Sequence, residues 1–267
     1  MFNIPLIPQG GQPIDFTGSN VLSYYTTDTT KRFEYGQGGM TWDGKVFRYS
    51  LATATLSVGY GAFNGANATV SRLINSVTPV AYVAGQRQIK VTIAATEGQS
   101  GNGVVATNEL IGALIVIGHG AQATAETRTV MGNTAVASGG GTTTVTLDYP
   151  LALAHTAGVA CELPLNPYRY LINASEYASV MCVPNIYVTT GYNFWGQTRG
   201  RCWCVPGGGD PTPGNTVNDR MAYFVGDGSV NFGTAITIET GYQFAGFCVD
   251  TTESGTSAMP VIQLMLE

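Results

Sequence analysis

Hydrophobic and polar residues alternate with a period of two along most of the chain, which is typical of strands buried on one face. Short runs of Val, Ile, Thr, Tyr and Phe are separated by Gly, Asn, Asp and Pro, and the chain contains 35 glycines. Glycine favours tight turns and disfavours helix interiors. The pattern predicts an all-β protein made of antiparallel sandwich or barrel domains, with long Gly- and Pro-rich loops and little helix.

The clearest local unit is MTWDGKVFRYSLA, residues 40–52. Asp43-Gly44 is a dipeptide that supplies the positive φ angles of a two-residue type I′ turn. Residues 46–51 then alternate, so that Phe47, Tyr49 and Leu51 share one apolar face. We therefore expect a β-hairpin here. The only candidate for helical turns is residues 65–76, where a few apolar residues fall near helical spacing.

Four strand candidates in the middle of the chain begin at residue 87, and turns rich in Gly, Ser and Asn separate them: RQIKVTIA, LIGALIVIG, AETRTVMGN and GTTTVTLDYPLAL. Their spacing suits a small antiparallel barrel or sandwich, which we place at residues 82–163. Residues 1–81 then form an N-terminal arm and hairpin region that packs with the C-terminal part. Residues 164–267 form a C-terminal β domain.

The C-terminal domain is predicted to contain many short strands, near 169–173, 179–189, 192–197, 201–205, 220–225, 234–239, 243–249 and 260–266. Between two of them lies VPGGGDPTPGN, residues 205–215, which is dense in Gly and Pro. A loop of this length in a compact domain is usually functional or mobile.

Composition points to a protein that is covered by partners. The chain is 44% hydrophobic but only 11% charged, whereas soluble domains average about 25% charged residues. Interfaces of obligate assemblies are apolar and their centres lack charge. With a net charge of −5, the chain offers no basic surface for nucleic acid.

Five cysteines cannot all pair within the chain, and they are too sparse for a disulfide framework. We interpret them as buried thiols of a protein that folds in a reducing cytoplasm. The N-terminal segment lacks the basic region of a signal peptide. The most apolar run, residues 110–120, is shorter than the ~20 residues of a membrane helix. We expect neither a signal peptide nor a membrane span.

No residue set predicts a reaction. His119 and His155 lack a second ligand at short spacing, and Cys202 and Cys204 lack the second pair of a zinc site. There is no G-x-S-x-G elbow, and the glycine-rich segments lack the Lys-Ser/Thr of a phosphate loop. The acidic side chains are interpreted as turn or solvent residues: Asp28, Glu34, Asp43, Glu97 and Asp148. We expect no enzyme activity, cofactor or metal.

The most unusual segment is GYNFWGQTRGRCWCVPGGGD, residues 191–210. Its period-two pattern places aromatic residues on both faces of a strand. Such a strand is either central in a sandwich or covered by another subunit. Aromatic and arginine side chains are enriched in interface hot spots, so the candidate subunit contact consists of Tyr192, Trp195, Arg199, Arg201 and Trp203.

Three segments resemble structural proteins of tailed bacteriophages: YYTTDTTKRFEYGQGGMTWDGKVFRYSLA, LPLNPYRYLI and TTGYNFWGQTRG. They occur in the same order as in those proteins, where the first forms an early hairpin. The resemblance implies a non-enzymatic virion protein of the capsid decoration or cement type, which binds the major capsid protein and stabilises the head shell. It also implies synthesis in the bacterial cytoplasm and a homo-oligomer, with a trimer as the natural arrangement.

Two other functions stay open at this point. The protein is alternatively a tail- or fibre-associated phage protein that binds a host glycan through exposed aromatic residues such as Trp203. A hydrolase hidden in a β-sandwich is the third hypothesis, against which the lack of a marked nucleophile, metal set or acid pair argues.

Overall fold

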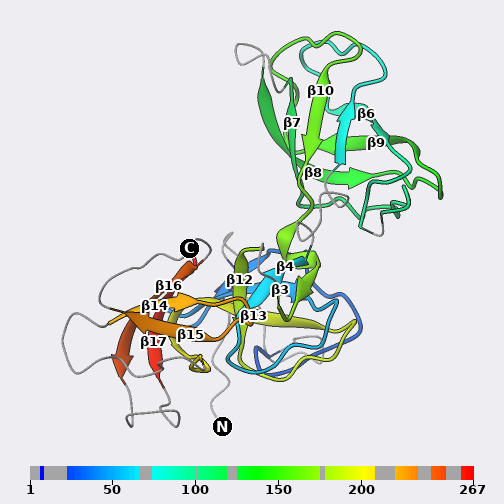
Figure 1. Ribbon diagram of the computed structural model, residues 1–267. Helices are drawn as coiled ribbons and strands as arrows, with labels where there is room; N and C mark the ends of the chain where they lie inside the picture. The colour runs from blue at the N-terminus through cyan, green and yellow to red at the C-terminus, as the bar shows by residue number, and fades with distance from the viewer. Residues whose placement is uncertain are drawn as a thin grey trace. The chain divides into compact units, whose positions relative to one another are not determined.

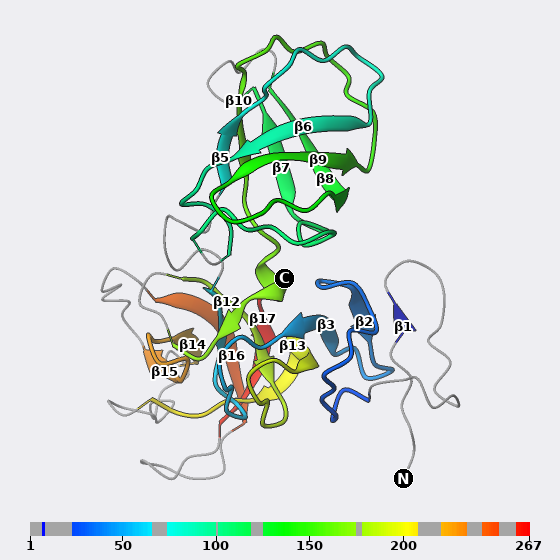
Figure 2. The same cartoon turned by 90° about the vertical axis from the view of Figure 1, so that its right-hand side faces the viewer.

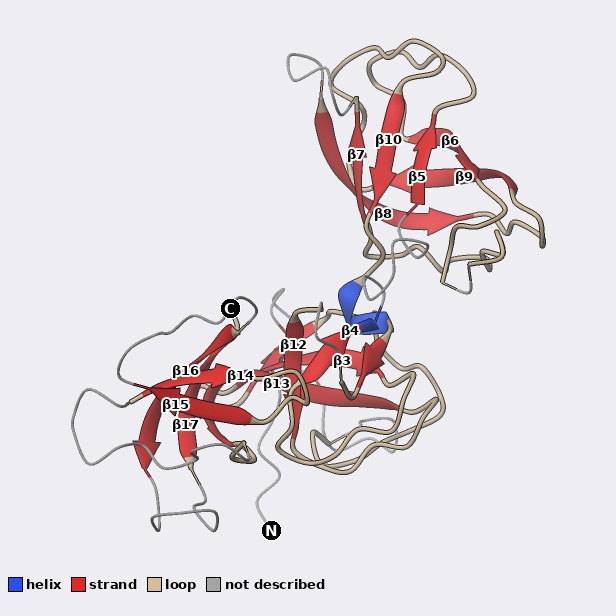
Figure 3. Ribbon diagram, in the orientation of Figure 1, coloured by secondary structure: helices blue, strands red, loops and turns tan. Residues whose placement is uncertain are grey.

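The computed structural model describes residues 7–8, 23–65, 74–99, 101–118, 125–174, 178–207, 220–233, 242–250 and 260–267. Within these ranges the regular structure consists of β-strands and short 3₁₀ turns such as η3 (Pro167–Arg169), with no α-helix (Figure 3). The strands form two antiparallel sheets, a half-barrel and a near-barrel. The prediction of an all-β protein with sandwich or barrel domains is confirmed.

The chain divides into two compact units (Figure 1). Unit 1 contains residues 1–65 and 168–267, and unit 2 contains residues 66–167. Unit 2 is therefore inserted in the sequence of unit 1. The boundaries expected from the sequence, 81/82 and 163/164, differ from these. The reason at the first boundary is that β5 (Ile74–Val77) pairs with β10 (Ala160–Leu163), so it belongs to unit 2.

The chain leaves and re-enters unit 1 at one place. Strand β4 (Ala62–Asn64) precedes the insertion and pairs with β11 (Leu171–Ile172), which follows it. The amide of Gly65 donates a 2.7 Å hydrogen bond to the carbonyl of Tyr170. Pairing within unit 1 thus holds the two ends of the insertion together. Unit 2 can therefore be inserted without separating β4 from β11.

Unit 1 contains, within the described residues, one sheet of eleven strands in which the main path runs β1-β2-β3-β13-β17-β16-β14-β15. Strands β4, β11 and β12 pair beside this path. The bounds of the strands not yet given are β1 (Ile7–Pro8), β2 (Gly38–Met40), β3 (Val46–Leu51), β12 (Val180–Pro184), β13 (Asn193–Trp203), β14 (Met221–Phe224), β15 (Val230–Gly233), β16 (Gln243–Asp250) and β17 (Val261–Met265).

Strand β13 organises this sheet. Its first half pairs with β3, from Asn193 opposite Leu51 onward, and its second half pairs with β17, through to Trp203 opposite Val261. Strand β12 pairs with its middle. The two strands expected at 192–197 and 201–205 are therefore one continuous strand, which passes through Gly200 at φ +93°.

The hairpin expected at residues 40–52 is confirmed, since β2 and β3 pair with Met40 opposite Val46. The predicted type I′ turn is wrong. Five residues connect the strands, the amide of Thr41 bonds the carbonyl of Lys45 at 2.9 Å, and only Gly44 of the dipeptide has a positive φ. The single apolar face is also wrong, because Val46 and Ser50 are buried along with Phe47 and Tyr49.

Unit 2 is a sheet of six described strands in the order β5-β10-β7-β8-β9-β6 (Figure 2). Its other strands are β6 (Gln88–Ile93), β7 (Leu114–Ile117), β8 (Glu126–Asn133) and β9 (Gly141–Leu147). The end strands β5 and β6 are in contact, so the sheet nearly closes. Its interior is filled by aliphatic side chains, among them Ile89, Val91, Ile115, Val130 and Leu147.

The four strands expected in the middle of the chain are present as β6, β7, β8 and β9. In the C-terminal part, strands are present near the predicted positions except at 234–239, which lies outside the described residues. The helical turns expected at 65–76 are wrong for residues 74–76, which belong to β5, while 66–73 lie outside the described residues.

Candidate functional site

Strand β13 has two halves with different surroundings. Residues 193–198 are all buried, so both faces of this half are covered by the protein's own chain. From residue 199 to residue 203 exposed and buried residues alternate. The candidate contact residues therefore separate into two groups. Trp195 belongs to the core, whereas Arg199, Arg201 and Trp203 point away from it.

Trp195 is fully buried in a cluster of aromatic rings with Phe47 and Tyr49. The ring centroids of Trp195 and Tyr49 are 5.3 Å apart in an edge-on arrangement, and Phe33 packs at the same distance. The indole Nε1 has no hydrogen-bond partner in the part of the chain that the structure describes. Tyr192 is half-buried and packs on a neighbouring cluster. Neither residue is available to form the centre of an interface.

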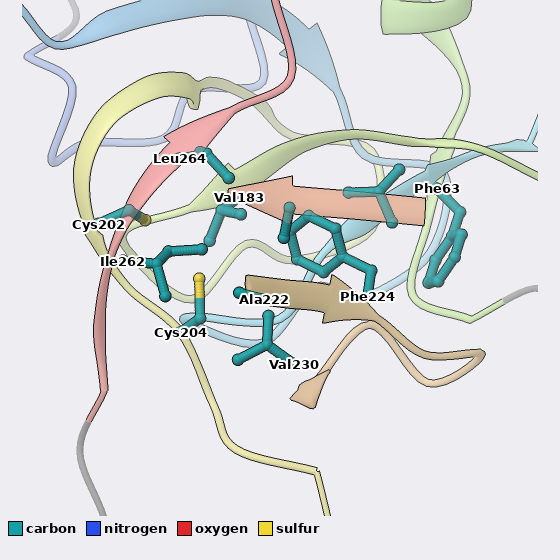
Figure 4. Close-up of a cluster of buried hydrophobic side chains, with 11 residues drawn as sticks. Phe63, Val183, Cys202, Cys204, Ala222, Phe224, Val230, Ile262 and Leu264 are labelled. Carbon is teal, nitrogen blue, oxygen red and sulfur yellow. The ribbon is translucent and has the colours of Figure 1, made fainter. Parts of the chain in front are cut away.

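Cys202, in the second half of β13, and Cys204, just after the end of this strand, point into the core of the half-barrel (Figure 4). In the close-up they lie among Val183, Ile262 and Leu264, with Phe224 and Val230 completing the cluster. Residues two apart on a strand share a face, so the residues between and beside the cysteines point outward. These residues are Arg201 and Trp203.

The outward residues of neighbouring strands line up across the sheet. Arg201 is opposite Gln263 on β17, Gln263 is opposite Phe247 on β16, and Phe247 is opposite Met221 on β14. Directly opposed residues of antiparallel strands lie on the same face. These four side chains therefore form one row that crosses four strands. Its ends, Arg201 and Met221, are both exposed.

Large apolar side chains lie in and beside this row, and their exposed fractions are 39% for Trp203, 48% for Met221, 41% for Phe244, 45% for Phe247 and 47% for Met265. We call the surface formed by these five residues and Tyr223 the outer face. Tyr223 packs edge-on against Phe244 with ring centroids 5.8 Å apart. A solvent-facing side of an antiparallel sheet is normally polar, so the outer face is unusual for a surface left to water.

A β-bulge in β16 concentrates aromatic residues on this face. The register with β14 shifts between Ala222 and Tyr223, opposite Ala245 and Gly246. Ala245 and Gly246 are both buried, and Phe244 and Phe247 on either side are both exposed. In a regular strand, residues three apart point to opposite faces. The bulge adds one residue to the strand and so brings both phenylalanines to the outer face.

The border of the outer face is positively charged. Arg199, Arg201 and Arg220 are exposed. Two acids lie nearby: Asp250 at the end of β16, and Glu267, which pairs with Arg48 and also interacts with Arg199. Arg201 forms no ion pair within the described residues. The chain as a whole carries a net charge of −5. This face is thus an apolar surface with an arginine border on an otherwise acidic protein.

The buried thiols do not form a reactive centre. Hydrogen bonding to Cys202 and burial raise the pKa of Cys204, and burial raises the pKa of Cys182. A thiol that stays protonated is a poor nucleophile and metal ligand. All five cysteines are free and buried, which agrees with their interpretation as core residues.

His155 is part of a buried polar network in unit 2. Its Nε2 lies 2.7 Å from Oε1 of Glu126, and Arg128 pairs with the other carboxylate oxygen. The same carboxylate accepts hydrogen bonds from the amides of Ala152 and Leu153. Burial raises the pKa of Glu126, but these bonds outweigh it and the pKa lies below its usual value. The network ties the 148–155 segment to β8.

Metal binding finds no support in the described residues, where no three His, Cys, Asp or Glu side chains come together. His119 lies outside them. Of the acids expected in turns, Asp28 binds the amide of Thr30 and pairs with Arg32, and Asp148 binds the amide of Thr129. Glu97 also caps a turn, at the amide of Ala94, but it is buried instead of solvent-exposed.

Comparison of the chain with protein-family models, with curated proteins and with solved structures finds no match. No helix in the described part of the chain is both long enough and apolar enough to cross a membrane.

The sequence predicted the part of this surface that β13 contributes, and it did not predict the part that β14 and β16 contribute. Arg199, Arg201 and Trp203 were identified from their residue types, but Phe244, Phe247 and Met221 were assigned only to strands. A signal was present in QFAGFCVD, where two phenylalanines flank Ala-Gly. Glycine inside a strand often marks a bulge, and a bulge would have placed both rings on one side.

Proposed function

We propose that this chain is a non-enzymatic virion protein of a tailed bacteriophage that binds the head shell as a decoration or cement protein. The observation that supports this proposal is the outer face of unit 1, where Trp203, Phe244 and Phe247 are exposed beside arginines. Aromatic residues, Met and Arg are the residue types enriched at protein interfaces. A rigid sheet also holds these side chains in place before binding, which lowers the entropy lost on association.

The partner that fits the outer face is a protein surface with an apolar centre and carboxylates around it. Arg199, Arg201 and Arg220 would meet those carboxylates, while Trp203 and the two phenylalanines would exclude water from the centre. We assign this role to the major capsid protein. A shell presents its surface in many copies, so even modest single contacts hold firmly when the bound protein is itself an oligomer.

A closed homo-oligomer, a trimer in our proposal, would bring three outer faces to neighbouring shell subunits. Closed symmetry is the rule for repeated subunits. Because three outer faces would then bind as one unit, detachment of a single contact would not release the protein. Sedimentation of the purified chain tests this part separately, and a monomer at high protein concentration would contradict it.

The proposed function is tested on purified particles. We expect the protein to co-purify with them at a fixed ratio to the major capsid protein that corresponds to many copies. Stripped particles should bind added wild-type protein and fail to bind the double variant Phe247→Ser, Arg201→Glu. A matched control is Tyr149→Ser with Arg87→Glu, which changes the same residue classes in unit 2. A few copies per particle, or unchanged binding by the first variant, would contradict the proposal.

A tail- or fibre-associated protein that binds a host glycan is the second candidate. The observation that favours it is the same group of exposed aromatic rings, since Trp203, Tyr223 and Phe244 offer flat surfaces on which sugar rings stack. Location separates the two candidates. Antibody labelling at the tail, together with low copy number, would replace the first proposal by the second.

A further inference from the structure

Unit 1 contains a second feature, a pocket of about 210 Å³ that lies outside the outer face. Its lining comes from three segments: the 56–61 turn between β3 and β4, Asn173 just after β11, and Asp227 in the turn between β14 and β15. The sheet topology brings these segments together from distant parts of the sequence. The pocket is not explained by packing of the core or by the proposed shell contact.

The pocket is lined in part by Gly61, whose backbone lies against that of Gly228. The amide of Gly61 donates a 2.6 Å hydrogen bond to the carbonyl of Gly228. A Cβ atom on Gly228, whose φ is +85°, would lie 2.5 Å from the carbonyl oxygen of Gly61. A Cβ atom on Gly61 would lie 2.8 Å from a side-chain carbon of Val180. A larger residue at position 61 would press on the core side chains of Val180 and Phe224, and one at position 228 would displace the backbone of Gly61.

The walls combine apolar surface with different polar groups. Leu56 is buried and Tyr60 is half-buried, while Ser57, Asn173 and Asp227 are exposed at the rim. The Oδ1 atom of Asp227 accepts hydrogen bonds from the amide of Ser229 at 2.9 Å and from its hydroxyl at 2.6 Å. These two bonds hold the carboxylate in one orientation before any ligand arrives.

We propose that this pocket binds one pyranose sugar ring. A carboxylate accepts hydrogen bonds only, whereas the Asn amide and the Ser and Tyr hydroxyls both donate and accept. Neighbouring hydroxyls of a sugar ring need this combination, and the ring's carbon face needs an apolar partner, which Tyr60 offers. The volume is below the ~300–1,000 Å³ typical of sites for drug-sized ligands, so a single ring suits it better than a larger molecule.

Other ligand classes fit less well. The described lining contains no Lys or Arg, and Asp227 repels anions, which disfavours a phosphate. Among the described lining residues Asp227 is the one carboxylate, and a hard cation in a protein takes six or more oxygen ligands. The inference does not depend on the shell contact, because the pocket residues and the outer-face residues are different.

The test is ligand-observed saturation-transfer NMR with the full chain and a panel of free hexoses, N-acetylhexosamines and 6-deoxyhexoses, each also as its methyl glycoside. We expect at least one sugar to bind with a Kd on the order of 1 mM, as suits a ligand of about a dozen non-hydrogen atoms. If the methyl glycoside binds as well as the free sugar, the natural ligand is a sugar residue within a glycan chain. If methylation abolishes binding, the ligand is a free sugar.

Variants connect the binding to the pocket. Tyr60→Ala and Asp227→Asn should each weaken binding about tenfold or more, and Asn at position 227 retains the oxygen that Ser229 binds. Tyr149→Ala, at an exposed tyrosine in unit 2, is the control and should bind like wild type. Binding of no sugar, unchanged affinity in both pocket variants, or displacement of the sugar by methylammonium would each overturn the inference. These pocket variants should bind particles as wild type does, because the shell contact is proposed at different residues; the two proposals are therefore tested independently.

Discussion

Phe244 and Phe247 lie on the same side of β16, although three positions separate them, because Ala245 and Gly246 between them form a bulge that faces the core. The bulge needs glycine. A Cβ atom on Gly246, whose φ is +145°, would lie 1.9 Å from the backbone carbonyl oxygen of Gln263 on β17. The aromatic content of the outer face thus depends on one residue that is itself buried.

Gly246→Ala is expected to destabilise unit 1 by about 3 kcal/mol, through backbone strain and the clash with the neighbouring strand. Denaturant unfolding followed by tryptophan fluorescence measures the loss, since all three tryptophans belong to unit 1. Gly44→Ala is the matched control. It also requires a positive φ but has no atom within 4 Å of the added carbon, so about 1 kcal/mol is expected. Equal losses for the two variants would contradict the role given to the bulge.

Two tryptophans on the same strand should behave differently on truncation. Trp195→Ala removes a fully buried ring from the aromatic cluster and is expected to cost about 3–5 kcal/mol. Trp203 is 39% exposed, and its ring rests on Gly59, where a Cβ atom would lie 2.6 Å away. Trp203→Ala should cost about 1 kcal/mol.

Unfolding in urea and particle binding, measured on the same preparations, separate the two roles. Trp203→Ala should remain folded and lose binding to the shell. If it unfolds as readily as Trp195→Ala, then Trp203 is a core residue and its assignment to the outer face is wrong.

The period-two pattern was sufficient to predict strands such as β3, β9 and β17, because alternation is a local property of the chain. It also predicted aromatic residues on both faces of the first half of β13. The pattern did not predict that residues of this same chain, and not of another subunit, bury both faces of this half of the strand. That cover includes Phe33, which is 162 positions before Trp195 in the sequence, and period-two alternation carries no information about contacts at such separation.

The polar network around Glu126 was also out of reach from the sequence. The residue type of His155 suggests metal binding, yet its partner is a carboxylate 29 positions away, on strand β8. The boundaries of the two compact units differ from the predicted domain boundaries for a similar reason. Only the pairing of β5 with β10 shows that residues 74–77 belong to the inserted unit.

The five thiols should be unreactive in the folded protein. All are buried and so out of reach of a reagent in solution, and burial also raises the pKa of Cys182 and Cys248. A chromogenic disulfide reagent is expected to modify none of them rapidly, and all five after unfolding in guanidinium. Thr107→Cys, at an exposed position, adds a reactive thiol as a positive control. Rapid modification of Cys202 or Cys204 would show that the half-barrel core opens under native conditions.

Acid should weaken unit 2 through Glu126. Its carboxyl pKa is lower in the folded protein than its ordinary value of 4.5, so the carboxylate stabilises the fold above about pH 4.5. This contribution is lost as the pH falls through the folded pKa, when Glu126 is protonated and its bonds to His155, Arg128 and the 152–153 amides weaken. Amide protection of Ala152 and Leu153, measured by hydrogen exchange from pH 6 to pH 3, follows the loss.

Glu126→Gln should lower the hydrogen-exchange protection of the Ala152 and Leu153 amides at pH 6 by about 2 kcal/mol. Acidification should then cause little further loss of protection in this variant. Glu109→Gln is the matched control, because it makes the same change at a carboxylate that accepts a hydrogen bond from a different amide, that of Ala106. It should leave the acid response of Ala152 and Leu153 unchanged. An acid response that is the same in wild type and in Glu126→Gln would show that another carboxyl group controls the acid stability of unit 2.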